Sequence, residues 1–274
     1  MTHESFLAAS VLDDDGVTAR SILSGITESR ERHSFTRIQH YRPQASTAQG
    51  LTTIKQLQKE RRPTTPLWQE LHQILVKQPS VVQVRMDITP EVENAMSGAA
   101  TGDDAPLVEI PGGKPCALRW VDLPDPPSPQ RPPFITQRRV VDIDDPRAPT
   151  ILAESKFGLK SDLIEESYSW WFEGIEYCLT RFFNLPASPD SNQNPDPAAP
   201  KQVPNPASLR PVGNIWILYI NAKVDATPAA TMPDRVKQAH ARLVGARDQL
   251  KGVFEFPAFD RRSHDTRVSG TRAP

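Results

Sequence analysis

The sequence contains few cysteines, no long apolar run and no excess of charge of one sign. Its 274 residues include 2 cysteines, Cys116 and Cys178, which are too few for a disulfide framework, so we expect a reducing compartment. The longest unbroken apolar stretch, residues 215–220, is too short to span a bilayer. Residues 1–4 lack the basic start of a signal peptide. We therefore expect a soluble intracellular protein with no membrane partner.

The formal net charge is -1, which gives no global electrostatic reason to bind nucleic acid or an anionic membrane. Basic residues occur as the isolated pairs Arg61-Arg62, Arg138-Arg139 and Arg261-Arg262 rather than as a dense patch. We expect these pairs to be solvated at the surface, and we expect no direct, sequence-specific contact with nucleic acid.

Motifs for catalysis, metal binding and cofactor binding are also missing from the sequence. The six histidines are scattered, the cysteines are far apart, and no Gly-x-Ser-x-Gly motif occurs. Residues 111–114, Pro-Gly-Gly-Lys, lack the spacing of a phosphate-binding loop, and Pro115 would interrupt the helix that such a loop needs. We interpret this segment as a turn. The sequence thus predicts no catalytic residue, no metal ligand and no cofactor.

Two acidic pairs need a separate interpretation, because carboxylates two positions apart on a strand share a face and can hold a divalent cation. Glu91 and Glu93 form one pair, and Asp142 and Asp144 form the other. The first pair follows Pro90 in a loop-like region. The second belongs to the run from Asp142 to Asp145, which meets Pro146 and which we interpret as a strand end turning into solvent. We interpret both pairs as solvated acids of loops or strand ends. Glu173 and Glu176 straddle an expected turn and do not share a face.

The 28 prolines are clustered, and these clusters mark the expected loops. We predict flexible insertions at residues 44–66, 89–106, 123–133 and 185–212, and a disordered tail at 263–274. Residues 45–66 could instead carry helical turns, as could 67–76. The remaining residues are enough for a single domain over 1–274.

The rest of the chain is mostly strand. Alternating and β-branched segments predict strands at 5–12, 33–41, 81–88, 117–122, 134–143, 151–157, 168–172, 175–183, 214–224 and 253–256. Helical spacing predicts helices from 17 to Gly25 and over 233–251. A helix over 163–182 is the alternative to a hairpin with its turn at Glu173-Gly174. We predict an α+β fold, mainly an antiparallel closed β-barrel with two or three flanking helices and long Pro-rich loops, because closure removes sheet edges.

Three adjacent aromatic residues, Trp170, Trp171 and Phe172, give the best indication of a partner-binding site. In a strand, one tryptophan points into the core and its neighbour points outward. An outward tryptophan is either covered by the same chain or belongs to an interface, where tryptophan is enriched. The strand at 214–224 is apolar on both faces, so we expect both faces to be covered.

Several segments occur in the order found in a known family. Residues 6–13, Phe-Leu-Ala-Ala-Ser-Val-Leu-Asp, precede a helix that ends Ile-Leu-Ser-Gly-Ile at 22–26. Ala-Leu-Arg-Trp follows at 117–120, with paired strands over 158–183, and residues 219–224 lead to the helix at 233–251. This order resembles the family of subunit 18 of the Mediator of RNA polymerase II transcription. The insertions at 123–133 and 185–212 resemble an elaboration of the filamentous-fungal type.

The resemblance implies a closed barrel that pairs with the related barrel of Mediator subunit 20 and is held by a C-terminal helix of subunit 8. It further implies a non-enzymatic, nuclear coactivator subunit of the head module, which contacts the RNA polymerase II machinery. The barrel also resembles that of metal-dependent RNA triphosphatases, which need two Glu-x-Glu strands facing a tunnel. The alternative function is therefore a divalent-metal-dependent triphosphate tunnel enzyme that would use Glu91 and Glu93.

Overall fold

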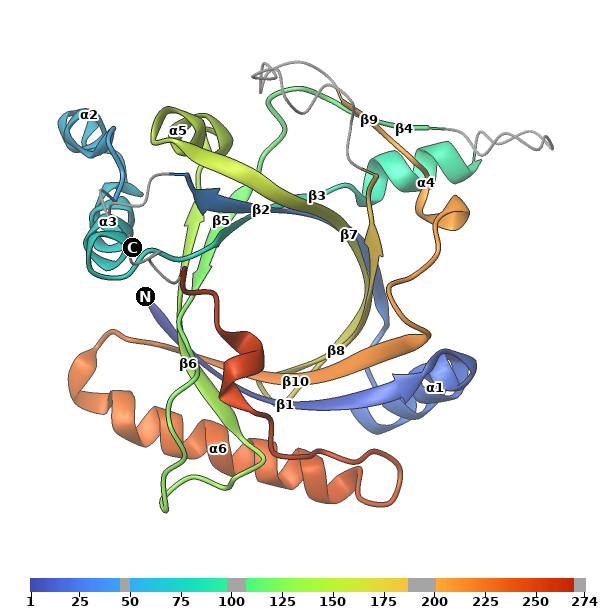
Figure 1. Ribbon diagram of the computed structural model, residues 1–274. Helices are drawn as coiled ribbons and strands as arrows, with labels where there is room; N and C mark the ends of the chain where they lie inside the picture. Colours follow the sequence, from blue (N-terminus) through green and yellow to red (C-terminus); the bar gives the residue numbers. More distant parts are fainter. Residues whose placement is uncertain (45–49, 98–106, 187–200, 269–274) are drawn as a thin grey trace, which may run out of the picture.

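The computed structural model describes residues 1–44, 50–97, 107–186 and 201–268. Eight antiparallel strands close into a barrel in the order β1-β10-β8-β7-β2-β3-β5-β6, as Figure 1 shows in a view down the barrel. The strands are β1 (Thr2–Leu12), β2 (Arg32–Pro43), β3 (Val82–Asp87), β5 (Ala117–Val121), β6 (Thr136–Asp144), β7 (Phe157–Phe172), β8 (Ile175–Asn184) and β10 (Ile215–Asp225). The predicted α+β fold with a closed antiparallel barrel is confirmed.

The chain closes the barrel by placing β1 between two strands that are distant in sequence. Thr2 to Leu12 pair with β10 over the full length of β1, and Thr2 to Phe6 also pair with β6. Strands β7 and β8 form the predicted hairpin, with Glu173 and Gly174 in the turn at φ of 49° and 75°. A glycine adopts this left-handed conformation without steric cost, which favours the turn at this point. The alternative helix over 163–182 is wrong.

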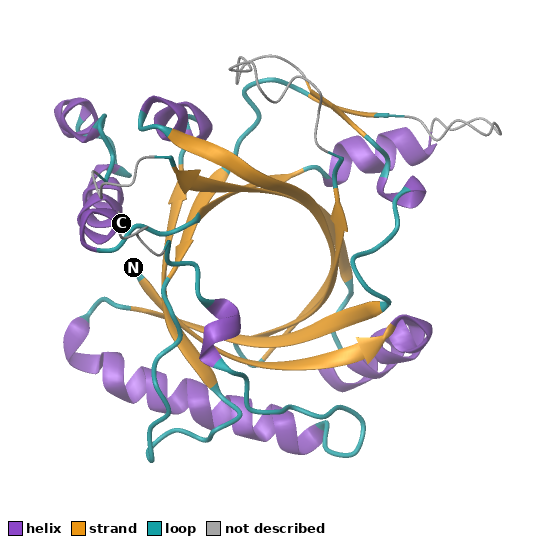
Figure 2. Ribbon diagram, viewed as in Figure 1, coloured by secondary structure: helices purple, strands orange, loops and turns teal. Residues whose placement is uncertain are grey.

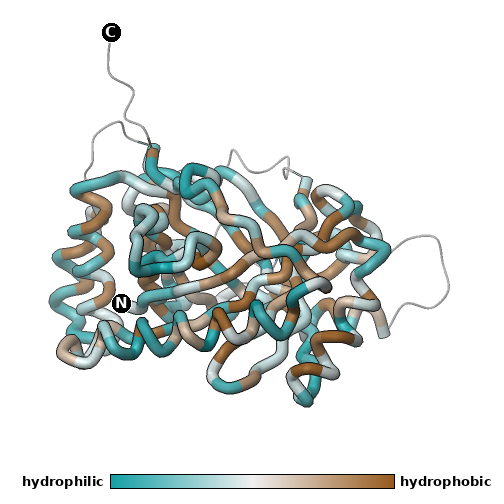
Figure 3. The backbone as a smooth tube through the Cα atoms, turned by 90° about the horizontal axis from the view of Figure 1, so that it is seen from below, coloured by the Kyte–Doolittle hydropathy of each residue, from teal (hydrophilic) through white to brown (hydrophobic). Residues whose placement is uncertain are grey.

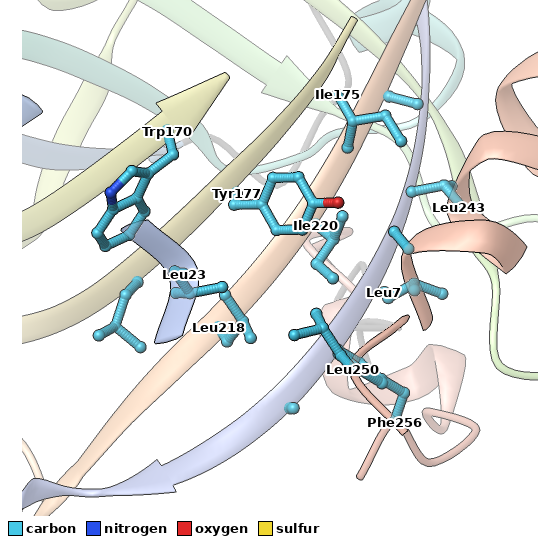
Figure 4. Packing of buried hydrophobic residues seen from close by; sticks show 14 of the residues in the cluster. Leu7, Leu23, Trp170, Ile175, Tyr177, Leu218, Ile220, Leu243, Leu250 and Phe256 are labelled. Atoms are coloured by element: carbon cyan, nitrogen blue, oxygen red, sulfur yellow. The ribbon is translucent and has the colours of Figure 1, made fainter. Parts of the chain in front are cut away.

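Two helices cover the outer wall over β1, β10, β8 and β7, and they create the largest apolar cluster. These are α1 (Gly16–Thr27) and α6 (Met232–Gln249). Figure 4 shows Leu218 and Ile220 of β10 beside Tyr177 of β8, with Leu243 of α6 packed nearby. Each of these four side chains is at most 1% exposed. Burial of such side chains supplies the main driving force for closing the wall against its helices.

The remaining helices form two further clusters around the same barrel (Figure 2). One contains Trp68 and Leu71 packed on β3, β5 and β6, and the other contains Val92. The first includes α2 (Ile54–Glu60), α3 (Thr65–Lys77) and α5 (Ala148–Glu154), and the second includes α4 (Thr89–Ser97) with β4 (Val108–Ile110) paired to β9 (Lys201–Val203).

The strands alternate between apolar residues that face these helices and polar residues that face the lumen. Successive side chains of a strand point to opposite faces, and directly paired residues share a face. Leu7 faces α6, so Glu4 and Phe6 face the lumen, together with their partners Arg138 and Thr136 on β6. Figure 3 shows the resulting alternation of hydrophobic and hydrophilic segments along the chain.

Some predicted elements differ from the structure. Residues 151–157 are not a strand, because α5 occupies 148–154 and buries Ile151 and Leu152 against the second cluster. Residues 253–256 lie outside any strand, and Phe256 instead contributes to the first cluster. Helix α1 continues beyond Gly25 to Thr27 and ends at Glu28, which takes the left-handed conformation at φ 48°.

The structure also corrects parts of the predicted insertions and tail. Helical turns were an open alternative for 45–66 and 67–76, and α2 and α3 confirm it. Residues 89–97, predicted as part of an insertion, form α4, and the 3-10 turn η3 (Pro206–Ser208) lies within 185–212. The segment 123–133 has no helix or strand. The predictions for 45–49, 98–106, 187–200 and 269–274 lie outside the described residues.

The end of the described chain crosses the mouth of the barrel. The 3-10 turn η5 (Arg261–His264) lies at the edge of the opening in Figure 1, and His264 meets the ring of Phe6 at 5.8 Å between centroids. The main-chain N–H of Val81 donates to the carbonyl of Thr266 at 2.8 Å. Residues 263–268 of the predicted disordered tail are therefore tied to the barrel.

Candidate partner-binding surface

Trp170 and Trp171 of the hairpin of β7 and β8 point to opposite faces of β7, because successive side chains of a strand alternate. Trp170 is 0% exposed and donates from Nε1 to Oγ of Ser24 on α1 at 3.0 Å, whereas Trp171 is 57% exposed. The prediction of one inward and one outward tryptophan is confirmed. Trp170 therefore anchors the hairpin to α1, and Trp171 projects from the rim of the barrel next to the turn.

A groove separates the hairpin from α6, on the face of the hairpin opposite to Trp171. Its volume is about 370 Å³. Phe172 and Tyr177 line it from the hairpin, and Ala241 and Gly245 line it from α6. A Cβ atom added to Gly245 would meet no heavy atom within 4 Å, so small residues leave this side of the groove open. We define the docking surface as Trp171, Phe172 and this groove.

Sequence reasoning found the aromatic half of the docking surface but missed the half on α6. Ala241 and Gly245 are four positions apart, so they lie on the same face of the helix. That spacing of small residues was visible in the sequence. It became meaningful only when the fold placed α6 beside the hairpin.

The lumen is polar, and its buried acid is neutralised by arginines. Glu4 accepts from Nη2 of Arg119 at 2.7 Å and from Nε of Arg138 at 2.7 Å. Burial alone would raise the pKa of Glu4, but the charges of Arg119 and Arg138 outweigh it and lower the pKa to about 2. Elsewhere in the lumen, Arg85 pairs with Glu165. Both carboxylates are therefore already paired with arginine.

Glu91 and Glu93 do not lie on a lumen strand. Both are on α4, which packs outside the barrel wall, and Glu91 pairs with Lys114. The expectation that they lie in a loop is corrected to a helix, because Val92 is fully buried and requires an ordered α4. The arrangement that the tunnel-enzyme alternative required of this pair is not present.

The acidic segment at 142–145 contains both exposed and buried side chains. Asp142 and Asp144 are exposed at the end of β6, as predicted. Asp145 is 2% exposed and accepts from Nε1 of Trp68 at 3.2 Å and from Arg147 at 2.8 Å, so its prediction as a solvated acid is wrong. Burial opposes ionisation of Asp145, but the hydrogen bonds from Arg147 and Trp68 lower its pKa overall.

Only some residues of the Arg-Arg pairs are solvated at the surface, although the sequence predicted this for all of them. Arg139 is exposed and pairs with Asp122, as expected, but Arg138 faces the lumen and stacks on Phe6 with 4.7 Å between its Cζ and the ring centroid. Adjacent strand residues point to opposite faces, which separates the two arginines. Arg61 is exposed, while Arg261 is half-buried in η5.

Histidine and cysteine side chains are dispersed among the structural contacts. His33 contacts Glu166 at 3.0 Å, and Nε2 of His240 lies 3.1 Å from Oγ of Ser5. Both cysteines are free, and burial raises the pKa of each thiol, that of Cys116 to about 11. Within the described ranges, no three His, Cys, Asp or Glu side chains are grouped to hold a metal ion. None of the helices found there is long and apolar enough to cross a membrane.

Fold and surface together define the class: a closed antiparallel β-barrel with flanking helices and an aromatic hairpin exposed at its rim. The sequence model of the Med18 protein family matches residues 3–267. The chain therefore belongs to the Med18 family, which confirms the resemblance seen in the order of its segments. Family membership supports the role of a Mediator subunit. None of the curated proteins compared by sequence matches the chain.

Solved structures resemble this chain at low sequence identity. A chain in the structure of the Schizosaccharomyces pombe Mediator head module is 13% identical, with a TM-score of 0.54 over 92% of this chain and 96% of that chain. The PH1819 protein from Pyrococcus horikoshii is 10% identical, with a TM-score of 0.43 over 95% of each chain. Only the first is close enough to support the fold.

Proposed function

We propose that this protein is a non-enzymatic, nuclear subunit of the Mediator head module that acts by binding other subunits and so helps to regulate RNA polymerase II transcription. The family match over residues 3–267 carries the proposal. The likeness to a chain of the S. pombe head module supports it at the level of the fold. The partners we propose are the related barrel of subunit 20 and the C-terminal helix of subunit 8.

The docking surface supports a binding role because it exposes apolar area next to an open groove. Trp171 is 57% exposed although large aromatic side chains are costly to leave in water. Tryptophan is enriched among residues that dominate binding energy, especially beside pockets that a partner can fill. Phe172 points to the opposite face of the strand and lines the groove of about 370 Å³, so apolar area is available on both sides of the hairpin tip. We propose that a partner subunit covers Trp171 and Phe172, while Trp170 holds the hairpin rigid from behind.

Co-expression with subunits 20 and 8 tests the binding role. We expect one complex on a sizing column, and we expect Trp171→Ala to weaken association by about tenfold or more, the range of an interface hot spot. Leu159→Ala is the matched control, because Leu159 is also exposed and lies on the other end of β7. A wild-type chain that stays monomeric beside both subunits would overturn the proposed partners. Equal binding by both variants would overturn the docking surface alone.

The pairing of the lumen acids supports a non-enzymatic role. A divalent cation needs carboxylate oxygens that are free to bind it, and Glu4 and Glu165 are each occupied by arginine. We expect purified protein to release no phosphate from a 5′-triphosphate RNA in the presence of manganese. Turnover that is lost in the Glu4→Gln variant would contradict a purely binding function.

A further inference from the structure

A second pocket lies on the outer wall of the barrel, lined by the start of α5 and by the chain that leads from β4 to β5. Its volume is about 230 Å³. Four cationic side chains line it, and none of its lining residues is Asp or Glu. The four are Arg37, Lys114, Arg147 and Lys201. Such a pocket attracts an anionic ligand to the extent that its cations are not already neutralised by neighbouring carboxylates.

Carboxylates behind the wall fix three of these cations in position. Asp162 accepts from Nε of Arg37 at 2.9 Å and also from Nη2, and this arginine side chain is only 7% exposed. This leaves Nη1 of Arg37 outside the bidentate pair. Glu91 forms an ion pair with Nζ of Lys114. Arg147 is held by Asp145 and by Glu60 at 2.7 Å. The cations are thus preorganised before any ligand arrives.

Lys201 has a different environment from the other three cations of the pocket. It begins β9, and it forms no ion pair with an acid of the described residues. Burial and the nearby charge of Arg37 lower the pKa of Lys201, and the charge of Asp162 opposes them only in part. Two cations share a half-buried site, so an anion bound between them would relieve their repulsion.

The Pro-Gly-Gly-Lys turn, which the sequence did not connect to any function, forms one side of this pocket. Gly113 has φ 69°, and a Cβ atom there would meet nothing within 4 Å, so this side of the wall is open. Met86 and Ile110 add apolar wall beside the cations. The pocket therefore combines a cationic end with an apolar end.

We propose that this pocket binds the phosphoryl group of a phosphorylated serine or threonine side chain on a partner protein. A phosphate dianion has the charge to match Lys201 and can bond to Nη1 of Arg37, which lies outside the pair with Asp162, because guanidinium groups form strong charge-assisted bonds to phosphate. The apolar wall contacts the aliphatic part of the same side chain. This site lies apart from the docking surface and does not depend on the proposed Mediator partners.

Binding is measured by NMR titration of the full-length protein with three probes. These are inorganic phosphate, a glycine pentapeptide with a central phosphoserine, and the same peptide with glutamate in that position. We expect the phosphoserine peptide and phosphate to shift resonances of Gly113 and Lys201, and the glutamate peptide to bind at least tenfold more weakly. Binding of phosphate without binding of the phosphoserine peptide would overturn the assignment to a protein side chain.

The variant Lys201→Gln tests the cation that carries the proposal. We expect its affinity for the phosphoserine peptide to fall at least tenfold. Lys251→Gln is the matched control, because Lys251 is exposed beyond the end of α6 and does not line the pocket. Lys114→Gln provides a second variant in case Lys201→Gln unfolds, and we expect a smaller loss because Glu91 already neutralises Lys114. Unchanged affinity in folded Lys201→Gln would overturn the site.

Discussion

The two faces of the barrel wall are stabilised in different ways. The outer face of β1 and β10 presents Leu7, Leu218 and Ile220, which are fully buried against α6. The inner face of the same wall presents Glu4, whose charge is balanced by arginines across the lumen. Most of the apolar packing of this protein therefore lies outside the barrel. The lumen holds a network in which each charge depends on its neighbours.

This difference predicts how each face responds to substitution. Removing methyl groups from the outer face leaves a cavity in an apolar cluster, and the cost depends on how far the cluster relaxes. Removing one charge from the lumen leaves partners that are buried and unpaired, which costs more than the pair itself contributes. Single charge removals in the lumen should therefore be at least as destructive as cavities in the outer cluster.

The largest expected effect comes from Glu4→Gln, which keeps the shape of the side chain and removes its charge. Arg119 and Arg138 are 15% and 18% exposed at the side chain, so they would be left close together with little solvent. We expect the free energy of unfolding in urea to fall by about 4 kcal/mol. Glu109→Gln on β4 is the control, since Glu109 is exposed and should change stability little. A loss below about 1 kcal/mol in Glu4→Gln would show that solvent screens the lumen.

The same variant should have a characteristic pH dependence. The pKa of Glu4 lies at about 2 in the folded protein, below its ordinary value of 4.5, so its contribution is complete above about pH 5 and is lost as the pH falls toward 2. We expect the stability difference between wild type and Glu4→Gln to shrink steadily over this window. A difference that stays constant from pH 6 to pH 3 would assign the effect to packing.

Leu218→Ala tests the outer face. Leu218 is 0% exposed within the cluster formed by β10, β8 and α6, so we expect a loss of about 3 kcal/mol in unfolding free energy. Ile217→Ala is the matched control, because Ile217 is the next residue on β10, points to the opposite face and is only half-buried. We expect less than half the loss there. Equal losses would mean that the lumen is packed as tightly as the outer wall.

The smallest expected effect is that of Arg139→Ala. Arg139 pairs with Asp122, but the arginine side chain is 46% exposed, and exposed pairs contribute little. We expect a change below about 1 kcal/mol in urea unfolding. Comparison with Glu4→Gln then shows the effect of burial on an ion pair. Glu4 pairs with Arg138 inside the lumen, whereas the neighbouring Arg139 pairs with Asp122 at the surface. A loss as large as that of Glu4→Gln would contradict this explanation.

Much of the fold could be predicted because local patterns were strong. The alternation in β1 and β10, the Glu173-Gly174 turn and the helical spacing of α6 each identified the correct element. Short apolar runs were harder, because length and composition do not separate a buried strand from a buried helix. Ile151 and Leu152 belong to such a run, and tertiary packing placed them in α5.

The docking surface and the outer pocket could be predicted only in part from the sequence, for a related reason. The sequence identified Trp171 and Phe172 through the period of a strand. It did not connect Phe172 with Gly245, nor Arg37 with Lys201, since each pair comes from distant parts of the chain. No local pattern records such a contact, because the contact exists only after the barrel closes.

The sequence by itself determined the strands of the hairpin, the helix α6 and the order of segments that identifies the family. These properties follow from side-chain period and turn chemistry, which act over a few residues. Only the tertiary structure decided that the apolar face of each strand points outward to helices and that the lumen holds paired charges. Alternation shows that a strand has two different faces, and closure of the barrel decides which of them becomes the inside.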